Sequence, residues 1–293
     1  MSVPEFPEFK PLELKDKVWV EGLLRRFPPE TCEMTFANMF IWRNAERPSW
    51  TMIGETLCVL CRPDSEPPYC LPPVGPGDPT KTAAACFDIV PRMSRVPESQ
   101  AELLAVDFAV TPDRDNADYV YRTRDLAELR GKKFDRKRNR IRKFTKNHVY
   151  SVVDLDSTRL SDCRKLLDVW AAEKAGSSEF EVQKSVIGEA IDHFADLDIC
   201  GCAVLVEERV EAFSIGGELS PETAVVHIEI GNPAFEGLPQ LINRECARRA
   251  WVDYAWINRE QDAGHPGLRR AKLSYRPHHL ITKYNITPRG CAS

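Results

Sequence analysis

The second half of the chain carries a fixed order of hydrophobic patterns, and this order limits the folds that the chain can adopt. Alternating apolar residues indicate strands, and apolar residues three or four positions apart indicate helices. The patterns predict a strand, two helices, three strands with hairpin-like breaks, a helix and two further strands. The corresponding ranges are 150–155, 160–176, 182–194, 200–206, 212–219, 224–230, 238–252, 254–257 and 280–286.

This order is typical of a GNAT-type acyltransferase fold. The first half of the chain is less regular and is compatible with a degenerate copy of the second half, although the sequence shows no repeat. Its expected elements are helices at 15–27 and 35–43, a hairpin at 50–61, and short strands at 108–110 and 119–121.

A length of 293 residues is comfortable for two domains of about 100–200 residues each. The predicted fold class is therefore α/β (α+β), with tandem GNAT-like acyltransferase domains. The N-terminal domain is expected at 1–129 and the C-terminal domain at 150–293, and a basic helix at 130–149 joins them.

The basic helix is the main electrostatic feature of the sequence. Lys132 to Lys146 contains nine basic residues and one acidic residue, which gives +8; since the whole chain carries −4, the remainder carries −4 − 8 = −12. A cluster of cations on one element attracts polyanions through their phosphates. The predicted nucleic-acid-binding residues are Lys133, Arg136, Lys137, Arg138, Arg140, Arg142 and Lys143. The alternative is a solvated helix that only joins two domains.

The strand at 225–232 carries two polar residues among core residues. Strict alternation places His227 and Glu229 on the same face of the strand, opposite Val226 and Ile228. Glu229 is a candidate general base or amine-binding group, and His227 is a candidate substrate-binding residue. The alternative is a sheet face covered by polar helix residues.

The turn that follows this strand bears on coenzyme A binding. Enzymes that use acetyl-coenzyme A carry a glycine-rich loop here, and its amides hold the pyrophosphate. Only Gly237 lies in this turn, and Pro239 removes one N–H donor. The sequence therefore argues against coenzyme A binding, although it is compatible with the binding of another anion at the start of this helix.

A second polar region, Ile257 to Tyr275, follows a predicted strand end, where binding groups often gather. Its mixed acids and bases suit a small zwitterion or an ester carbonyl, and the alternative is a polar surface loop. The candidate catalytic residues are Asp262, Arg269 and Lys272, together with Glu229. The candidate substrate-binding residues are Asn258, Arg259, Glu260, Ser274 and Tyr275, together with His227.

The cysteines and the N-terminus indicate the compartment. The ten cysteines lie mainly in apolar strand-like runs, and Cys58-x-x-Cys61 has no second ligand pair at zinc spacing, so we expect reduced core thiols and no metal. The N-terminus has no secretory signal, and no stretch reaches the roughly 18 apolar residues of a spanning helix. These features predict a soluble, cytoplasmic protein whose membrane contact, if any, is peripheral.

Four stretches resemble a known family. They are 8–17, 35–43 (Thr-Phe-Ala-Asn-Met-Phe-Ile-Trp-Arg), 121–144 and 258–284. They are similar to stand-alone bacterial proteins related to the C-terminal domain of phosphatidylglycerol lysyltransferases, and the resemblance spans about residues 6–286. It implies a tandem GNAT-like fold with a basic helix between the halves.

The resemblance also implies an activity. The membrane-bound relatives move an amino acid from aminoacyl-tRNA onto a lipid head group, and Fem-type peptidyltransferases move it onto a cell-wall precursor. The basic helix would match the segment that meets the tRNA. Two departures limit the inference: the chain has no transmembrane half, so the acceptor is not carried over, and the loop at 258–275 differs, so the amino acid is not carried over.

The sequence therefore predicts an aminoacyl-tRNA-dependent acyltransferase with a lipid, peptide or small-molecule acceptor and no cofactor. Glu229 or Asp262 would bind the donor amine or take the acceptor's proton, and Arg269 or Lys272 would face the developing oxyanion. One alternative is an N-acyltransferase that uses an acyl-coenzyme A. The other is a non-catalytic protein that binds RNA or another anion.

Overall fold

The structure is a computed structural model that describes residues 3–172 and 178–290. The chain forms two compact units. Unit 1 comprises Met1–Asp118, Gln261–Arg269 and Leu280–Ser293, and unit 2 comprises Tyr119–Glu260 and Arg270–His279. The domain limits predicted from the sequence, 1–129 and 150–293, stay a prediction.

Unit 1 is built on a mixed sheet with the strand order β1-β2-β3-β4-β5-β12-β6, in which β4 and β5 are parallel. Its core contains the thiols of Cys58, Cys70 and Cys86 among aliphatic side chains. Its elements are β1 (Lys10–Pro11), α1 (Lys17–Arg26), α2 (Phe36–Ile41), α3 (Arg43–Glu46), β2 (Ser49–Ile53), β3 (Thr56–Cys61), β4 (Tyr69–Cys70), α4 (Pro79–Phe87), β5 (Met93–Pro97), α5 (Glu98–Leu104), the first part of β6 (Phe108–Arg122) and β12 (His279–Pro288).

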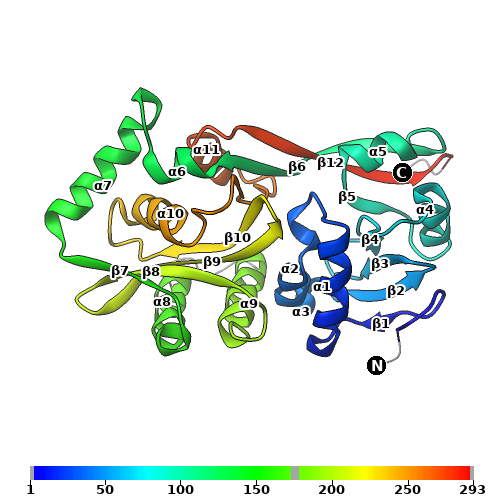
Figure 1. Cartoon of the computed structure of the whole chain (residues 1–293), viewed down its shortest axis with the longest axis horizontal. Coiled ribbons are helices and arrows are strands. Elements are labelled where there is room, and N and C mark those ends of the chain that lie inside the picture. The colour runs from blue at the N-terminus through cyan, green and yellow to red at the C-terminus, as the bar shows by residue number, and fades with distance from the viewer. Residues whose placement is uncertain (1–2, 173–177, 291–293) are drawn as a thin grey trace. The chain divides into compact units, whose positions relative to one another are not determined.

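Unit 2 has the strand order β6-β11-β10-β9-β8-β7, in which β10 and β11 are parallel. Helix α10 covers one face of this sheet, and α8 and α9 cover the other (Figure 1). Its elements are α6 (Thr123–Glu128), α7 (Asp135–Asn147), β7 (Tyr150–Asp154), α8 (Leu160–Ala172), α9 (Ser178–Asp192), β8 (Cys200–Val206), β9 (Arg209–Ser220), β10 (Thr223–Gly231), α10 (Leu238–Arg249), β11 (Trp256–Asn258) and part of α11 (Pro266–Leu273).

The predicted fold class is confirmed. The chain is α/β, and unit 2 follows the helix and strand order of the GNAT-type acyltransferase fold. The nine described cysteines are free thiols, and all of them except Cys200 are buried, as the sequence predicts. Within the described residues, no helix combines the length and the apolar composition that a membrane crossing requires.

Two elements differ from the sequence prediction. The expected short strands at 108–110 and 119–121 are parts of one strand, β6, whose polar middle gives no signal of side-chain alternation. The polar region at 257–275 is not all loop, since α11 begins at Pro266, and proline is favoured at the first position of a helix. The predicted end of α8 near Gly176 lies outside the described residues.

A fully buried lysine organises unit 1. Lys283 lies on β12, and its ammonium donates to both carboxylate oxygens of Glu33 at 2.7 Å and to Asp118 Oδ1 at 2.6 Å. The Cys32 backbone N–H donates to Asp118 Oδ2 at 2.9 Å. Cys32, Glu33 and Asp118 are spaced closely enough to hold a metal ion, but the Lys283 ammonium already supplies the cation between the two carboxylates.

We expect Lys283→Met to lower the free energy of unfolding by about 3–5 kcal/mol, because it leaves two buried carboxylates without their cation. Urea unfolding followed by circular dichroism measures this change. Lys81→Met, at an exposed position on α4, is the matched control and should change stability by no more than about 0.5 kcal/mol. A loss below about 1 kcal/mol for Lys283→Met would contradict the assignment.

Candidate functional site

A β-bulge sets the position of Glu229 on β10. Val226 pairs with Gly216 and Ile228 pairs with Ile215, so His227 is an extra residue inserted between these two pairs. Because Gly216 and Ile215 are successive residues of β9, Val226 and Ile228 lie on opposite faces. The sequence prediction that they share a face is therefore wrong, since alternation cannot register an inserted residue.

Glu229 is held by two partners from different elements. Its Oε1 accepts a hydrogen bond from Arg259 Nη2 at 3.0 Å, and its Oε2 accepts one from Asn243 Nδ2 of α10 at 2.9 Å. Both charged side chains are largely buried, at 16% and 13% exposure. The carboxylate is thus fixed in place and charge-compensated, which suits positioning better than free proton transfer.

Arg259 lies directly after β11 and is surrounded by aromatic rings. Its guanidinium lies 4.8 Å from the ring centre of Tyr275 and 5.6 Å from that of Tyr121. Burial opposes the charged form, but the Glu229 carboxylate and the two tyrosine hydroxyls outweigh it and raise the pKa of Arg259. The guanidinium therefore stays positively charged.

The site contains one unused donor and one unused acceptor. Arg259 Nη1 and Asn243 Oδ1 are both buried and have no hydrogen-bond partner among the described residues. Buried polar atoms are nearly always hydrogen-bonded in folded proteins. A ligand that accepts a hydrogen bond at one point and donates one at another would satisfy both atoms.

Lys137 joins this site from α7. Its ammonium lies 3.9 Å from the Tyr275 ring centre and donates to Ser274 Oγ at 2.6 Å. Burial, followed by repulsion from Arg259 and Arg140, lowers the pKa of Lys137 to about 8. A lysine with this pKa exchanges a proton near neutral pH, as a general base or acid must. We call Lys137, Glu229, Asn243, Arg259 and Tyr275 the Glu229 site.

Helix α7 packs closely against the turn before α10. A Cβ atom at Gly237, whose φ is +92°, would lie 2.2 Å from the Arg140 carbonyl oxygen. The Phe235 ring of the turn contacts Phe144 of α7, with ring centres 6.1 Å apart, and Glu236 pairs with Lys143 at 2.5 Å. The backbone of α7 therefore occupies the space beside the residue that caps α10.

The remaining unit 2 candidates hold the backbone around the Glu229 site. The Lys272 ammonium donates to the carbonyl oxygens of Arg259 and Glu260, and Asn258 Oδ1 accepts from the Glu260 N–H at 2.8 Å. His227 Nδ1 lies 2.8 Å from Glu260 Oε1. These contacts fix the turn after β11, in which Glu260 has a φ of +55°. We therefore assign Lys272 a positioning role.

The candidates Asp262 and Arg269 belong to unit 1. Arg269 donates to both carboxylate oxygens of the buried Asp262, at 2.8 and 2.7 Å, and Arg114 lies 3.3 Å from the same carboxylate. Asp262 Oδ1 also accepts from the Gly264 N–H at 3.0 Å. The structure thus brings Asp262 and Arg269 together as an ion pair that shapes its own turn.

In the segment from Lys132 to Lys146, the apolar residues Phe134, Ile141 and Phe144 are buried. Seven of the nine cations of this segment fall into three groups. Lys133, Arg138 and Lys143 have acidic partners, respectively Asp125, Asp135 and Glu236, and Lys137 turns into the Glu229 site. Arg136, Arg140 and Arg142 are exposed and form no ion pair with a described residue.

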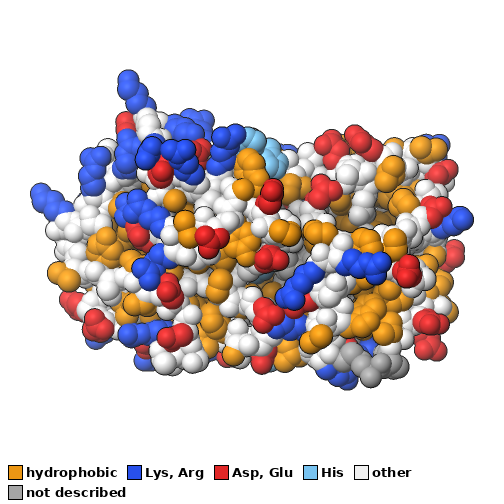
Figure 2. Space-filling model, in the orientation of Figure 1, with side chains coloured by type: hydrophobic (Ala, Val, Ile, Leu, Met, Phe, Trp, Pro, Cys, Tyr) orange, Lys and Arg blue, Asp and Glu red, His pale blue; other side chains and the backbone are white. Residues whose placement is uncertain are grey.

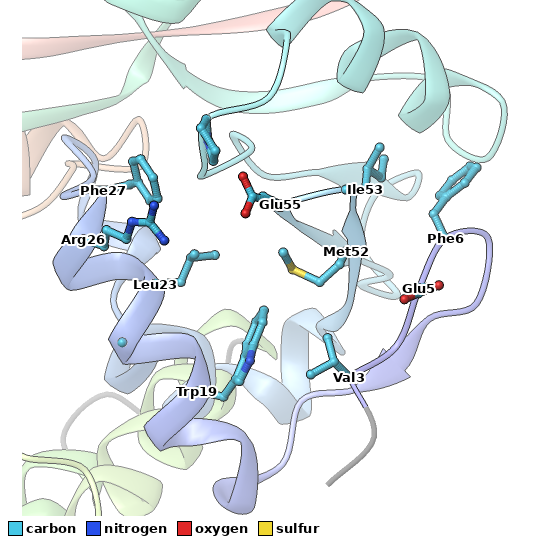
Figure 3. A pocket seen from close by; sticks show the side chains of 13 residues that line it. Val3, Glu5, Phe6, Trp19, Leu23, Arg26, Phe27, Met52, Ile53 and Glu55 are labelled. Atoms are coloured by element: carbon cyan, nitrogen blue, oxygen red, sulfur yellow. The ribbon is translucent and has the colours of Figure 1, made fainter.

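A cavity of about 740 Å³ opens in unit 1 beside α1 (Figure 3). Trp19 and Leu23 project from α1 toward Met52, while Arg26 and Glu55 provide charges at its edge. None of the site residues predicted from the sequence lines this cavity.

Asn243 of the Glu229 site and the Tyr121 ring beside Arg259 have no signal in the sequence. Asn243 is one polar residue on an amphipathic helix, and Tyr121 lies in a strand that looks hydrophobic. The sequence predicts Lys137 as a phosphate-binding cation, because charge patterning does not reveal which cation of a helix is buried.

Comparisons with known proteins cover nearly the whole chain. Residues 24–287 match the family described as "Phosphatidylglycerol lysyltransferase, C-terminal". A crystal structure of a conserved protein of unknown function from Bacteroides thetaiotaomicron has 29% identity and a TM-score of 0.87, covering 96% of this chain and 99% of that one. No curated protein sequence matches the chain significantly.

Two more distant structures share the fold. The structure of L-PGS from Bacillus licheniformis has 14% identity and a TM-score of 0.66, and the alignment covers 100% of this chain and 95% of that one. The crystal structure of FemX has 8% identity and a TM-score of 0.57, with 95% and 96% covered.

The close approach of α7 to Gly237 can be tested with a matched pair of variants. Gly237→Ala and Gly290→Ala introduce the same Cβ at the same φ of +92°, but Gly290 has no neighbour within 4 Å. Both should lose about 1–2 kcal/mol from the left-handed backbone, and Gly237→Ala should lose a further ~1–3 kcal/mol from overpacking. Equal losses in urea unfolding would contradict the contact.

The pKa of Lys137 can be measured by trace acetylation at a series of pH values, with mass spectrometry of each lysine. Only the neutral amine reacts, so labelling of Lys137 should rise with pH and level off above about 8. Ordinary lysines titrate near pH ~10.4 and should keep gaining reactivity. Arg140→Gln removes a repelling charge and should move the Lys137 midpoint upward. Labelling of Lys137 that still rises steeply at pH 10 would refute the assignment.

Proposed function

The chain belongs to the family of the phosphatidylglycerol lysyltransferase C-terminal domain, and on this premise we propose that it is an aminoacyl-tRNA-dependent acyltransferase. The observation that carries the proposal is the arrangement of α7. This helix presents three exposed arginines to solvent and also places a lysine of lowered pKa in the Glu229 site.

The donor would be bound through its phosphates. Figure 2 shows Lys and Arg side chains gathered over the part of unit 2 that contains α6 and α7. The exposed Arg136, Arg140 and Arg142 form no close ion pair within the described residues, so a bound phosphate displaces none. Binding of this kind releases counterions and depends strongly on salt.

The transfer step uses the groups of the Glu229 site. The nucleophilic N–H or O–H of the acceptor attacks the carbonyl carbon of the aminoacyl ester while neutral Lys137 takes its proton. The carbonyl oxygen gains negative charge and accepts a hydrogen bond from Arg259 Nη1. The bond to the ribose oxygen then breaks, and the Lys137 ammonium returns the proton to that oxygen. The ester is already activated, so positioning and charge stabilisation suffice.

Glu229 has a supporting part in this scheme. It keeps the guanidinium of Arg259 oriented through Nη2 and leaves Nη1 for the carbonyl oxygen. Asp262 and Arg269 are left out because they are paired with each other in unit 1.

The structure disfavours the acyl-coenzyme A alternative. The pyrophosphate of coenzyme A needs the amides of the turn between β10 and α10. Gly237 of that turn lies against the Arg140 carbonyl, whose partial negative charge repels an anion, and Pro239 offers no N–H.

Reversing the three unpaired arginines tests the donor. Arg136, Arg140 and Arg142 changed together to Glu reduce the local charge from +8 by six, to +2. We expect tRNA affinity in filter binding at ~0.1 M salt to fall at least about tenfold, with a flatter salt dependence. Arg138 is left unchanged because it donates to the carbonyl oxygens of Leu129 and Gly131 and thereby supports the start of the helix.

The control carries the same change of charge elsewhere. Arg25, Lys81 and Lys165 are exposed and lie on other helices, so their combined change to Glu should leave tRNA binding intact. Equal losses in both triple variants would mean that only net charge matters, and no binding of charged or uncharged tRNA by the wild type would refute the proposal. Binding without transfer to lipid, peptide or amine acceptors would favour the non-catalytic alternative.

A further inference from the structure

A second, smaller cavity in unit 1 is lined by charged and polar side chains. Its volume is about 60 Å³. It lies beside α2 and α3, and Arg95 reaches it from β5. The residues that matter for its chemistry are Glu33, Asn38, Trp42, Glu46, Arg95 and Gln261, all of unit 1.

The backbone of β5 is distorted in order to place Arg95 there. Val96 pairs with Tyr284 and Met93 with Ile286, so two residues of β5 oppose one residue of β12. This β-bulge puts Arg95 at a φ of +62°, a conformation that costs a non-glycine residue about 1–2 kcal/mol. Bulges commonly redirect a side chain next to a functional site.

The charges at this cavity are incompletely matched. Glu46 accepts from the Tyr69 hydroxyl at 2.7 Å and from Arg95 Nη2 at 3.3 Å, while Arg95 Nε lies 3.7 Å from Glu33. That last separation is too long for a hydrogen bond, and the buried Arg95 Nε has no partner among the described residues. Glu33, Glu46 and Asp118 thus form a connected group of three carboxylates with two cations, Arg95 and Lys283, and Arg95 Nε is still an unused donor.

A ligand that suits this lining needs two features. It must bring a cation with N–H donors, because the three carboxylates of Glu33, Asp118 and Glu46 exceed by one the two charges of Lys283 and Arg95. It must also bring an acceptor oxygen for Arg95 Nε. An inorganic cation lacks the acceptor, and a simple carboxylate would face two carboxylates of like charge.

The size of the cavity restricts the ligand further. One water needs at least about 10–15 Å³, so a cavity of about 60 Å³ has room for roughly four to six water-sized groups. Glycine has five non-hydrogen atoms and alanine has six. The Trp42 and Met39 side chains, which also line the cavity, leave no room for a long side chain.

We propose that this cavity binds a small α-amino acid zwitterion of the size of glycine or alanine. Its ammonium lies between Glu33 and Glu46, and its carboxylate accepts from Arg95 Nε and from the side-chain amides of Asn38 and Gln261. The site is independent of the proposed transfer reaction, because it contains no residue of the Glu229 site. If the protein does not bind tRNA, the proposal of an amino acid site in this cavity is therefore not contradicted.

The wild-type protein tests the proposal without any mutation. Isothermal titration at pH 7.5 with glycine, L-alanine, L-leucine, methylammonium and acetate separates the two required charges from the size limit. We expect saturable binding of glycine and alanine, and binding at least tenfold weaker for leucine and for each single-charge analogue. No saturable binding of glycine or alanine, or methylammonium binding as tightly as glycine, would overturn the proposal.

Two variants address the individual contacts. Glu46→Gln removes one carboxylate, and Arg95→Lys keeps the charge but removes the Nε donor; each should weaken glycine binding at least tenfold. Glu55→Gln, at an exposed position beside the larger cavity, is the control and should bind glycine as the wild type does. Circular dichroism and thermal melting establish that each variant is folded before titration. Unchanged affinity in both folded site variants would refute the assignment.

Discussion

The ion cluster around Lys283 is the interaction on which unit 1 most depends. Glu33 and Asp118 are buried, and burial raises the pKa of Glu33, so without a cation their charges would oppose folding. The cation comes from a residue 250 positions away from Glu33 and 165 positions away from Asp118. The N-terminal unit is therefore completed only when the last strand of the chain joins its sheet.

The same cluster lies next to the smaller cavity. Both carboxylate oxygens of Glu33 accept hydrogen bonds from Lys283. Glu33 also lines the cavity, where Arg95 Nε lies 3.7 Å from it. The Glu229 site in unit 2 also contains a carboxylate whose two oxygens both accept hydrogen bonds, here from Arg259 and Asn243. In both places a β-bulge in a central strand sits beside the site, and an arginine keeps one N–H unused. Carboxylates fixed in this way orient a guanidinium and leave a donor for a ligand.

The sequence predicts regular elements better than sites. The strands and helices between Tyr150 and Asn258 follow from hydrophobic patterns, because a sheet covered on both faces gives continuous apolar runs and the helices that cover it give amphipathic ones. Glu229 is recognisable as a polar residue within an apolar strand, and Arg259 and Tyr275 as members of the polar region that follows β11. The bulge at His227, the partner Asn243 and the pairing of Asp262 with Arg269 are not recognisable, because each depends on pairing between strands or on packing between side chains. The Lys283 cluster is missed for the same reason: a lysine in a C-terminal strand looks like a solvent-facing residue.

Helix α7 shows how burial, and not residue type, decides what a cation can do. The nine cations from Lys132 to Lys146, seven of them on α7, repel one another, and the structure relieves this by pairing three with acids and desolvating a fourth. A lysine with a pKa of about 8 carries its charge only part of the time near that pH, so it attracts phosphate less than an arginine does but can accept a proton. Arg140 takes part in both roles, since it is exposed to solvent and also repels the Lys137 ammonium. The charge of Arg140 therefore helps to keep part of the Lys137 side chain in its neutral amine form.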